Sequence, residues 1–455
     1  MRIGKETNKM AIWYIDPTAS TQENDGLTPN TPKASAEGLV LHGGDRVLFR
    51  RGRVIRSMLP TTAGETDAPI TYGAYGEGDK PVFCTSLDAS SPEDWSECAP
   101  NIWQYLHPTR GDVGNIIFVK KTEDGRSWSE LQPHEKNAQL DGATLRWERD
   151  GLCEQGDFWD SRFGESNHPK ETPTEQELLL YSVGNPARVY AHIELAHWAD
   201  RRIGWLKSNI IIEDLEFFGA GVHALAGDHA DNVIVRRCTF RMIGGCVWSH
   251  DLHIRFGNAV EFWESGNDIL IEDNDFYGVY DSCVTHQGPG EQTVPARNFI
   301  CRRNTFNTYG MAAFEYRDKM MIHSEFTDNL CINAGCGFPI YGEVLPRRSE
   351  IWPQPMGHHI FLWRINGATD GGSLVIARNS FESAPIGAAI YSIIAPEAEA
   401  QMAVSDNTYN TDNPDLLCHA GGISYNNMHK YTIATGWDLD DDPDRAQTWI
   451  AGTHS

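Results

Sequence analysis

Three short segments in the middle of the chain share one alternating pattern of apolar and polar residues. They are Asn258–Trp263 (NAVEFW), Ser282–Gln287 (SCVTHQ) and Ala312–Arg317 (AAFEYR), and they align without gaps. Alternation with a period of two residues is typical of a β-strand with one apolar and one polar face. Repetition every few tens of residues is the signature of a solenoid, so we expect equivalent residues of successive turns to form columns.

A second repeat begins near Asn209. The segments that open successive turns end on an aromatic residue and read IIIEDLEF, VIVRRCTF, ILIEDNDF, FICRRNTF, LVIARNSF and MAVSDNTY. An asparagine recurs in one slot of this repeat, at Asn274, Asn304, Asn329, Asn379 and Asn407. Amide side chains at such a bend can bond the backbone of the turns above and below. We therefore expect an internal asparagine ladder, to which we assign no chemistry.

Short turns of this kind, each with three strands, predict an all-β fold, a single-stranded parallel β-helix. We expect four regions: an N-terminal cap with the first β-helix turns (1–120), an inserted loop and β-subdomain (121–205), the main parallel β-helix with a catalytic groove (206–425), and a C-terminal tail with a short helix (426–455). Short strands bounded by turn residues, including Asn115–Lys120, support the first region. The rhythm then breaks in a polar stretch, and solenoid insertions collect on one face.

The expected C-terminal helix is Asp440–Ile450 (DDDPDRAQTWI), which opens with acidic residues and a proline. A calcium loop in the overlapping stretch DLDDDPD is the alternative. That stretch lacks the glycine and the distal glutamate of an EF-hand, so we favour the helix.

Composition restricts the partners. The 455 residues carry a net charge of -25, which argues against nucleic acid because phosphate contacts need a basic surface. A polyanionic glycan would need a local arginine patch or a bound cation. No apolar run is long enough for a transmembrane helix, so we expect no membrane partner. The first residues lack a signal-peptide hydrophobic region, which predicts a cytoplasmic location, or a secreted or periplasmic one if a leader precedes them. The oligomeric state stays open.

The ten cysteines show no CxxC pair and no zinc-site spacing. We expect them to be small buried apolar residues of a reduced protein.

Carboxylates gather in the three aligned segments. Glu261 and Glu315 share a column two turns apart, and Asp281 lies in the turn before the middle segment. Two carboxyl groups that flank a glycosidic bond can supply a general acid and a nucleophile or base. We therefore expect these three residues to be catalytic. The alternative is that they are solvated acids or partners of arginines.

Other side chains suit a substrate-binding groove. Trp263, Gln287 and Arg317 share the next outward column, and aromatic faces stack on sugar rings. The remaining binding candidates are Arg255, Asn258, His286 and Tyr316. Strict alternation points His286 and Tyr316 inward, so core packing is the alternative for both. His250, Asp251 and His253 form an HDxH motif, but this spacing alone is weak and we expect a substrate-contacting loop rather than a metal site.

The opening YIDPTAS…GDRVLFRRG…PITYGAYGEGDKPVF resembles the N-terminal part of carbohydrate-active, right-handed parallel β-helix proteins of the pectate-lyase-like superfamily. The block IRFGNAVEFW…VYDSCVTHQG…FEYRD is similar to the central signature of right-handed β-helix repeat proteins. The resemblance covers most of the chain and implies a right-handed helix. It leaves the reaction open, because this superfamily includes lyases, glycoside hydrolases, epimerases and esterases.

Three functions remain under consideration. The leading one is a glycoside hydrolase that acts on a polysaccharide or oligosaccharide with paired carboxylates and no cofactor. The second is a polysaccharide lyase that removes the C5 proton beside a uronic acid, with Arg255, Arg317, His286 and Tyr316 as candidate groups and calcium as a possible cofactor. The third is a non-catalytic glycan-binding module, against which the paired acids argue.

Overall fold

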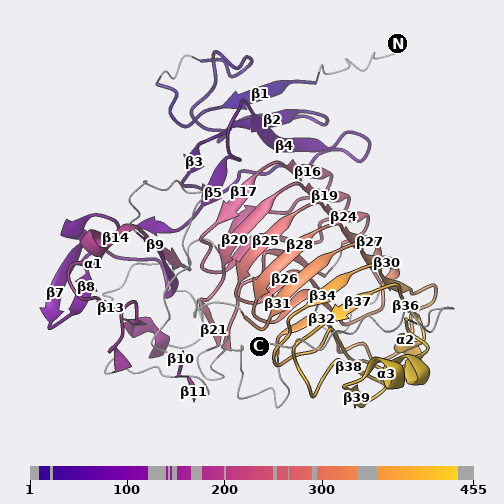
Figure 1. The fold of residues 1–455 in the computed structure, drawn as a ribbon. Coiled ribbons are helices and arrows are strands. Elements are labelled where there is room, and N and C mark those ends of the chain that lie inside the picture. Colours follow the sequence, from indigo (N-terminus) through magenta and orange to yellow (C-terminus); the bar gives the residue numbers. More distant parts are fainter. Residues whose placement is uncertain are drawn as a thin grey trace, which may run out of the picture.

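The computed structural model describes residues 10–20, 24–120, 140–141, 144–145, 151–164, 177–198, 201–249, 254–264, 266–288, 295–336 and 356–438. Three long sheets dominate it and run side by side along one axis (Figure 1). From β16 to β38, each turn of chain contributes one strand to each sheet, as expected of a parallel β-helix. The predicted all-β fold class is confirmed.

We call the three sheets A, B and C. Sheet A has ten strands: β1 (Ile12–Ile15), β2 (Arg46–Arg50), β4 (Ile70–Tyr75), β16 (Ile210–Glu213), β19 (Val233–Arg236), β24 (Ile269–Glu272), β27 (Arg297–Arg302), β30 (Ile322–Thr327), β33 (Leu374–Ala377) and β36 (Met402–Ser405). Sheet B has nine: β3 (Val54–Ile55), β5 (Val82–Cys84), β17 (Glu216–Phe218), β20 (Thr239–Ile243), β25 (Asp275–Val279), β28 (Thr305–Tyr309), β31 (Leu330–Ala334), β34 (Ser380–Glu382) and β37 (Thr408–Asn410).

Sheet C also has nine strands: β15 (Arg202–Trp205), β18 (His223–Asp228), β23 (Val260–Trp263), β26 (Ser282–Gln287), β29 (Ala312–Arg317), β32 (His358–Trp363), β35 (Ile390–Ile393), β38 (Cys418–Ala420) and β39 (Ile423–Tyr425). Its strands pair in parallel except at the end, where β38 and β39 pair antiparallel. The three segments that align in the sequence are β23, β26 and β29, which are neighbours in sheet C.

The predicted asparagine ladder is confirmed. The backbone N–H and the Nδ2 of Asn274 both donate to Oδ1 of Asn304, each at 3.0 Å. The same pair of bonds recurs along the ladder to Asn329, Asn379 and Asn407. Asp438 accepts the last pair, from Asn407. The bend between sheets A and B is thus satisfied by side-chain amides in the interior.

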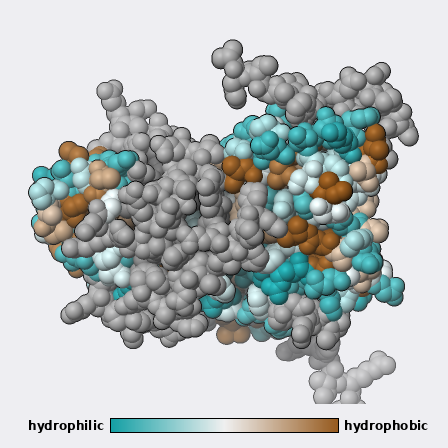
Figure 2. All heavy atoms as spheres, turned by 90° about the horizontal axis from the view of Figure 1, so that it is seen from below, coloured by the Kyte–Doolittle hydropathy of each residue, from teal (hydrophilic) through white to brown (hydrophobic). Residues whose placement is uncertain are grey.

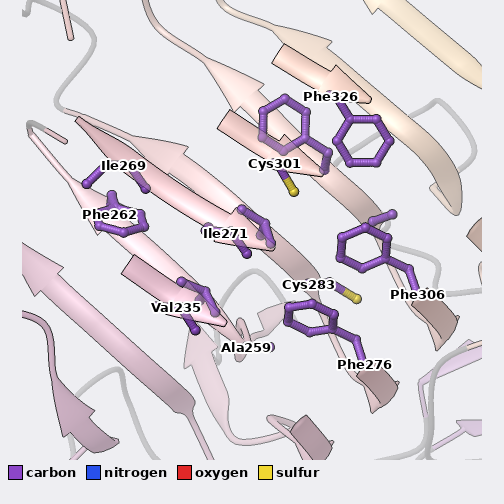
Figure 3. Packing of buried hydrophobic residues seen from close by; sticks show 14 of the residues in the cluster. Val235, Ala259, Phe262, Ile269, Ile271, Phe276, Cys283, Cys301, Phe306 and Phe326 are labelled. Atoms are coloured by element: carbon purple, nitrogen blue, oxygen red, sulfur yellow. The ribbon is translucent and has the colours of Figure 1, made fainter. Parts of the chain in front are cut away.

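Aromatic rings stack behind this ladder in sheet B. Phe240 and Phe276 have ring centroids 4.7 Å apart, and so do Phe276 and Phe306. Figure 3 shows the rings of Phe276 and Phe306 beside the sulfur atom of Cys283. Seven of the cysteines are buried, as predicted, whereas Cys98 and Cys153 are exposed and Cys336 is intermediate. Every cysteine that the structure describes is free.

Two antiparallel sheets form a lobe beside the β-helix (Figure 1). One contains β12 (Phe158–Asp160), β13 (Leu178–Tyr181), β8 (Ile102–Tyr105) and β7 (Trp95–Ala99) in that order, and the other contains β6 (Leu87–Asp88), β14 (Tyr190–His197) and β9 (Val113–Lys120). The expectation that Asn115–Lys120 belongs to the first β-helix turns is wrong. This apolar stretch pairs antiparallel with β14 instead, because Ile116 and Phe118 pack in the core of the lobe while Ile117 packs against Phe218 and Met242 of the β-helix. The division into four regions stays a prediction.

The remaining described elements are short. They are the strand pairs β10 (Leu140–Asp141) with β11 (Thr144–Leu145) and β21 (Val247–Ser249) with β22 (Ile254–Arg255), the 3₁₀ helices Pro92–Asp94 and Ser161–Gly164, and the helices α1 (Pro186–Val189), α2 (Pro396–Glu399) and α3 (Met428–Thr435). The helix predicted at Asp440–Ile450 lies outside the described residues. No helix in the described ranges is long and apolar enough to cross a membrane. Seen from below, the coloured surface is mainly hydrophilic with separate hydrophobic patches (Figure 2).

Candidate active site

A cleft of about 1050 Å³ lies over the outer face of sheet C. Five successive strands, β15, β18, β23, β26 and β29, supply its polar wall, and β32 continues it. The side chains that line the cleft are Arg201, Arg202, His223, Asp228, Trp248, Phe256, Asn258, Glu261, Trp263, Asp281, Gln287, Met311, Glu315, Arg317, Met356, Phe361, Trp363, Arg364 and Ile393. The cleft is therefore charged at the β15 end and mainly apolar at the β32 end, where Arg364 adds one charged side chain.

Strand register creates the two predicted outward columns. Glu261 pairs with Thr285, which pairs with Glu315. Trp263 pairs with Gln287 on the neighbouring strand. Because side chains alternate along a strand, these residues and Arg317 share the outer face of sheet C and line one cleft.

Glu261 is the more accessible of the two glutamates, with 14% of its side chain exposed. The Nδ2 of Asn258 donates to its Oε2 at 2.5 Å. The Oδ1 of Asn258 accepts the backbone N–H of Ser282 at 3.0 Å, which fixes the orientation of the amide. Burial raises the pKa of Glu261, while the Asn258 hydrogen bond and the charge of Arg317 act in the opposite direction.

His223 lies 3.4 Å from Glu261, but the contact is not an ion pair. The Nδ1 of His223 accepts the backbone N–H of Asn258 at 3.1 Å, so this nitrogen carries no proton. Burial, and then the nearby charge of Arg202, lower the pKa of His223 to about 3. A neutral imidazole therefore stands beside Glu261 at neutral pH.

Glu315 is only 2% exposed, and several donors hold its carboxyl group. Its Oε2 accepts from the hydroxyls of Thr285 at 2.9 Å and Ser282 at 3.2 Å, and from Nε2 of Gln287 at 3.4 Å. Its Oε1 accepts the indole N–H of Trp363 at 2.9 Å. Burial raises the pKa of Glu315, the charge of Arg317 lowers it, and the charge of Asp281 raises it further.

Asp281 lies between the two glutamates along the axis. It precedes β26 and lines the cleft, with 8% of the residue exposed. Its backbone N–H donates to Gly257 and its carbonyl accepts from Met311, so the turn is tied to the rungs on both sides. The negative charge of Asp281 raises the pKa of Glu315 and acts in the same direction on the pKa of His223.

Arg317 is packed between two indole rings. Its Cζ lies 5.0 Å from the ring centroid of Trp363 and 6.0 Å from that of Trp263. Its Nη2 donates to Oε1 of Gln287. The guanidinium therefore orders the aromatic and amide side chains of the outward column.

Three predicted binding residues do not reach the cleft. Arg255 is buried and donates to the carbonyl oxygens of Gly245 and Gly114, so it anchors backbone between the lobe and the β-helix. The prediction that His286 and Tyr316 bind substrate is also wrong, because neither side chain lines the cleft. The strand continues past Thr285 to Gln287, so alternation keeps both side chains in the interior. His286 packs against Phe299, and the hydroxyl of Tyr316 accepts the backbone N–H of Met321.

Sequence reasoning missed both ends of the cleft. Arg202 and His223 come from β15 and β18, and Phe361 and Trp363 come from β32. In HHIFLW the aromatic residues Phe361 and Trp363 alternate with the aliphatic Ile360 and Leu362, and this alternation was a usable signal for β32. For β18 the outward position that pairs with Glu261 is Ala226, which carries no chemical signature.

A metal site in the cleft is not indicated by the described residues. The predicted alternative at His250, Asp251 and His253 lies outside them. Within the described ranges, the group of three potential ligands with atoms inside 4.8 Å is Asp88, His192 and Glu194, in the lobe. Arg56 already donates to both oxygens of Glu194, and so supplies the compensating charge there.

No protein-family model and no curated protein matches the sequence. Among solved structures, the complex of XylC with xylose has a TM-score of 0.48 at 15% identity, covering 88% of this chain and 62% of that chain. The GH136 lacto-N-biosidase from Eubacterium ramulus has a TM-score of 0.45 at 14% identity, covering 90% and 62%.

The pectate lyase Pel9A has a TM-score of 0.40 at 10% identity, covering 91% of this chain and 81% of that one. The chain thus spans 62% of the length of the first two structures. The similar structures include carbohydrate-active proteins, as the sequence resemblance predicted, and both hydrolases and lyases are among them.

Proposed function

We propose that this protein is a glycoside hydrolase that cleaves a polysaccharide or oligosaccharide in the cleft over sheet C. The observation that carries the proposal is the pairing of two acids with different surroundings on adjacent rungs. Glu261 is partly exposed with one hydrogen-bond donor and a raised pKa, and Asp281 lies one rung further along the same cleft. An acid that keeps its proton beside one that is ionised is what glycoside hydrolysis requires.

Glu261 is the general acid in this mechanism. Its Oε2 is occupied by the Asn258 amide, so the transferable proton sits on Oε1. Protonation of the glycosidic oxygen by Glu261 lets the bond to the leaving sugar break. The fixed amide of Asn258 keeps the carboxyl group in one orientation through the step.

Asp281 is the nucleophile. Adjacent rungs are about 4.8 Å apart, which matches the separation of about 5–5.5 Å in retaining enzymes. Its carboxylate attacks the anomeric carbon, and Glu261 then acts as base for the water that releases the product. The alternative pair, Glu261 with Glu315, is two rungs apart and predicts inversion instead.

The aromatic side chains that line the cleft favour a carbohydrate as the substrate. Trp263 lies beside Glu261 and is partly exposed, so its ring can stack on a sugar. Replacing Trp263 with alanine should raise KM more than it lowers kcat, because stacking acts on the ground state.

The lyase alternative is weaker in this cleft. Of its four candidate groups, Arg255, His286 and Tyr316 lie in the interior, and Arg317 is packed between indole rings. His223 lines the cleft, but its Nδ1 lone pair already accepts a backbone N–H.

A screen with defined polysaccharides tests the proposal. Reducing ends measure any cleavage, ultraviolet absorbance detects the unsaturated product of a lyase, and proton NMR identifies the first-formed anomer. We expect new reducing ends without unsaturation, retention of configuration, and loss of activity in Glu261→Gln and Asp281→Asn. Glu325→Gln, on the outer face of sheet A, is the matched control. Full activity in both active-site variants, or an unsaturated product, would refute the hydrolase.

A further inference from the structure

The β15 end of the cleft contains a buried guanidinium with few partners. Arg202 lines the cleft and is only 8% exposed. Its Nη1 donates to the carbonyl oxygen of Ala226 at 3.4 Å, and its buried Nε meets no acceptor among the described residues. A guanidinium has five N–H donors, and a buried charge is costly unless those donors are used.

Other arginines of the β-helix are different. Arg236 donates to Glu213 at 2.7 and 2.9 Å, and Arg302 donates to Glu272 at 2.9 and 3.0 Å. The Nε of Arg317 also forms no hydrogen bond within the part of the chain that the structure describes, but it lies 3.4 Å from a carboxylate oxygen of Asp318. Within the described ranges, Arg202 forms no ion pair with a carboxylate. An ion pair with an acidic neighbour therefore does not hold Arg202 in place.

Packing fixes that position. The Cζ of Arg202 lies 3.3 Å from the ring centroid of Trp205, so one face of the guanidinium is covered by the indole. This cation–π contact stabilises the charge but uses none of the N–H donors in the plane of the group. Arg201, which is exposed, adds a second positive charge at the same end of the cleft.

The neighbouring acids do not neutralise this end. Asp228 and Glu261 attract Arg202 only over distance, and burial lowers the pKa of Arg202 while these two acids raise it. His223, the register partner of Arg202, is neutral at neutral pH, since its pKa is lowered to about 3. Two arginines thus face two acids, of which Glu261 has a raised pKa.

We propose that Arg202, with Arg201 beside it, binds an anionic substituent of the glycan, a carboxylate or a sulfate ester. The inference rests on the proposed function and adds the substrate class to it. Arg202 belongs to the strand two rungs before that of Glu261, so the anionic group binds about 10 Å along the axis from the acid. The charged sugar then lies on the β15 side of the scissile bond, and the uncharged part lies toward Trp363.

The planar fork of arginine suits both anions, because each presents two oxygens to parallel N–H donors. The protein carries a net charge of -25, so an acidic glycan gains no long-range attraction and must be recognised at short range. A lysine at this position keeps the positive charge but lacks the parallel N–H donors of arginine. The Arg202→Lys variant therefore distinguishes recognition of the geometry of the anion from simple electrostatic attraction.

Binding is measured by calorimetry in the Glu261→Gln variant, which prevents turnover. The carboxylate probes are trimers of galacturonate and of glucuronate, each paired with its methyl ester, which has the same skeleton without the charge. The sulfate probe is a sulfated galactotriose paired with its unsulfated form. We expect at least one charged probe to bind about tenfold or more tightly than its neutral partner, as a charge-assisted pair requires.

In the same background, Arg202→Met should abolish this preference and Arg202→Lys should restore little of it. Arg378→Met is the matched control, because Arg378 pairs with Asp328 on the exposed face of the β-helix. If Arg202→Met does not fold, the comparison of charged with neutral probes still tests whether the cleft binds an anionic substituent.

The outcomes of these experiments distinguish the anion site from the proposed hydrolase activity. Tight binding of a charged probe without hydrolysis of any glycan would overturn the hydrolase and keep the anion site. Hydrolysis of glycans with no preference for the charged member of any pair would overturn the anion site and keep the hydrolase. A preference that survives Arg202→Met would also overturn it.

Discussion

Glu261 and Glu315 occupy one column of one sheet, two rungs apart, yet their surroundings differ. Glu261 accepts one side-chain hydrogen bond and is partly exposed, whereas Glu315 accepts from four side chains and is almost fully buried. A carboxyl group that donates a proton needs one oxygen free to reach the substrate. A structural carboxyl group instead has both oxygens occupied by hydrogen-bond donors. We therefore propose that the same side chain performs different tasks at these two equivalent positions, and that its hydrogen-bond partners indicate which task.

Replacing Glu261 with glutamine should give the largest effect on activity. We expect kcat to fall about 10²–10⁴-fold, the usual contribution of a general acid, with little loss of stability. Measuring kcat on the natural glycan and on an aryl glycoside with a good leaving group checks the role. The aryl glycoside should lose much less, since its departure needs no proton. An equal loss on both substrates would contradict the assignment as acid.

Replacing Glu315 with glutamine should act mainly on stability. The new amide presents N–H groups to the donors of Thr285, Ser282 and Trp363, so at least one buried donor is left without an acceptor. We expect the free energy of unfolding to fall by about 1–3 kcal/mol. Urea denaturation of Glu315→Gln beside Glu261→Gln measures the difference. The comparison fails if Glu261→Gln is the less stable of the two.

Replacing Asn258 with alanine should move the pH profile. The Asn258 hydrogen bond favours the ionised form of Glu261, so its removal raises the pKa of Glu261 above its already raised value. A general acid works below its pKa, and the alkaline limb of kcat/KM should therefore shift to higher pH. The profile of Glu315→Gln serves as the reference. An unchanged or lowered alkaline limb in Asn258→Ala would show that another group sets it.

The smallest effect is expected from the two tryptophans of the cleft wall. Trp363→Phe removes the indole N–H that Glu315 accepts, which should cost about 1 kcal/mol of stability. Trp263→Phe is its matched control, since the indole N–H of Trp263 bonds Glu264, at 3.2 Å, and not Glu315. Thermal unfolding of both variants checks the contrast, which requires the larger decrease in Trp363→Phe.

The repeat made much of this molecule predictable. Alternation in three aligned segments placed Glu261, Gln287 and Glu315 on one face, because a period of two leaves a side chain only two directions. The asparagine slot identified the ladder for the same reason, since each member repeats the one before it. The catalytic roles themselves stay predictions.

What the sequence did not reveal depends on contacts between unlike segments. Arg255 reads as a binding residue at the base of a loop, but β22 pairs with β21 and turns it toward carbonyl groups of the lobe and its neighbouring turn. Arg202 lies on the first strand of sheet C, and the preceding turn contributes only an isolated bridge between Leu59 and Gly204, so no earlier described strand of this sheet aligns with it. Hydrogen-bond saturation at Glu315 also needs Trp363, which follows a long interval in the chain.

The asparagine ladder makes the β-helix a one-dimensional chain of coupled units. Each amide bonds only its nearest neighbours, and all of them point the same way, toward Asp438. In such a chain the damage from a lost unit depends on its distance from an end. Losing Asn407 shortens the run by its last amide, whereas losing Asn329 divides it into two short runs on either side of the rung that contains β32, the strand that carries Trp363.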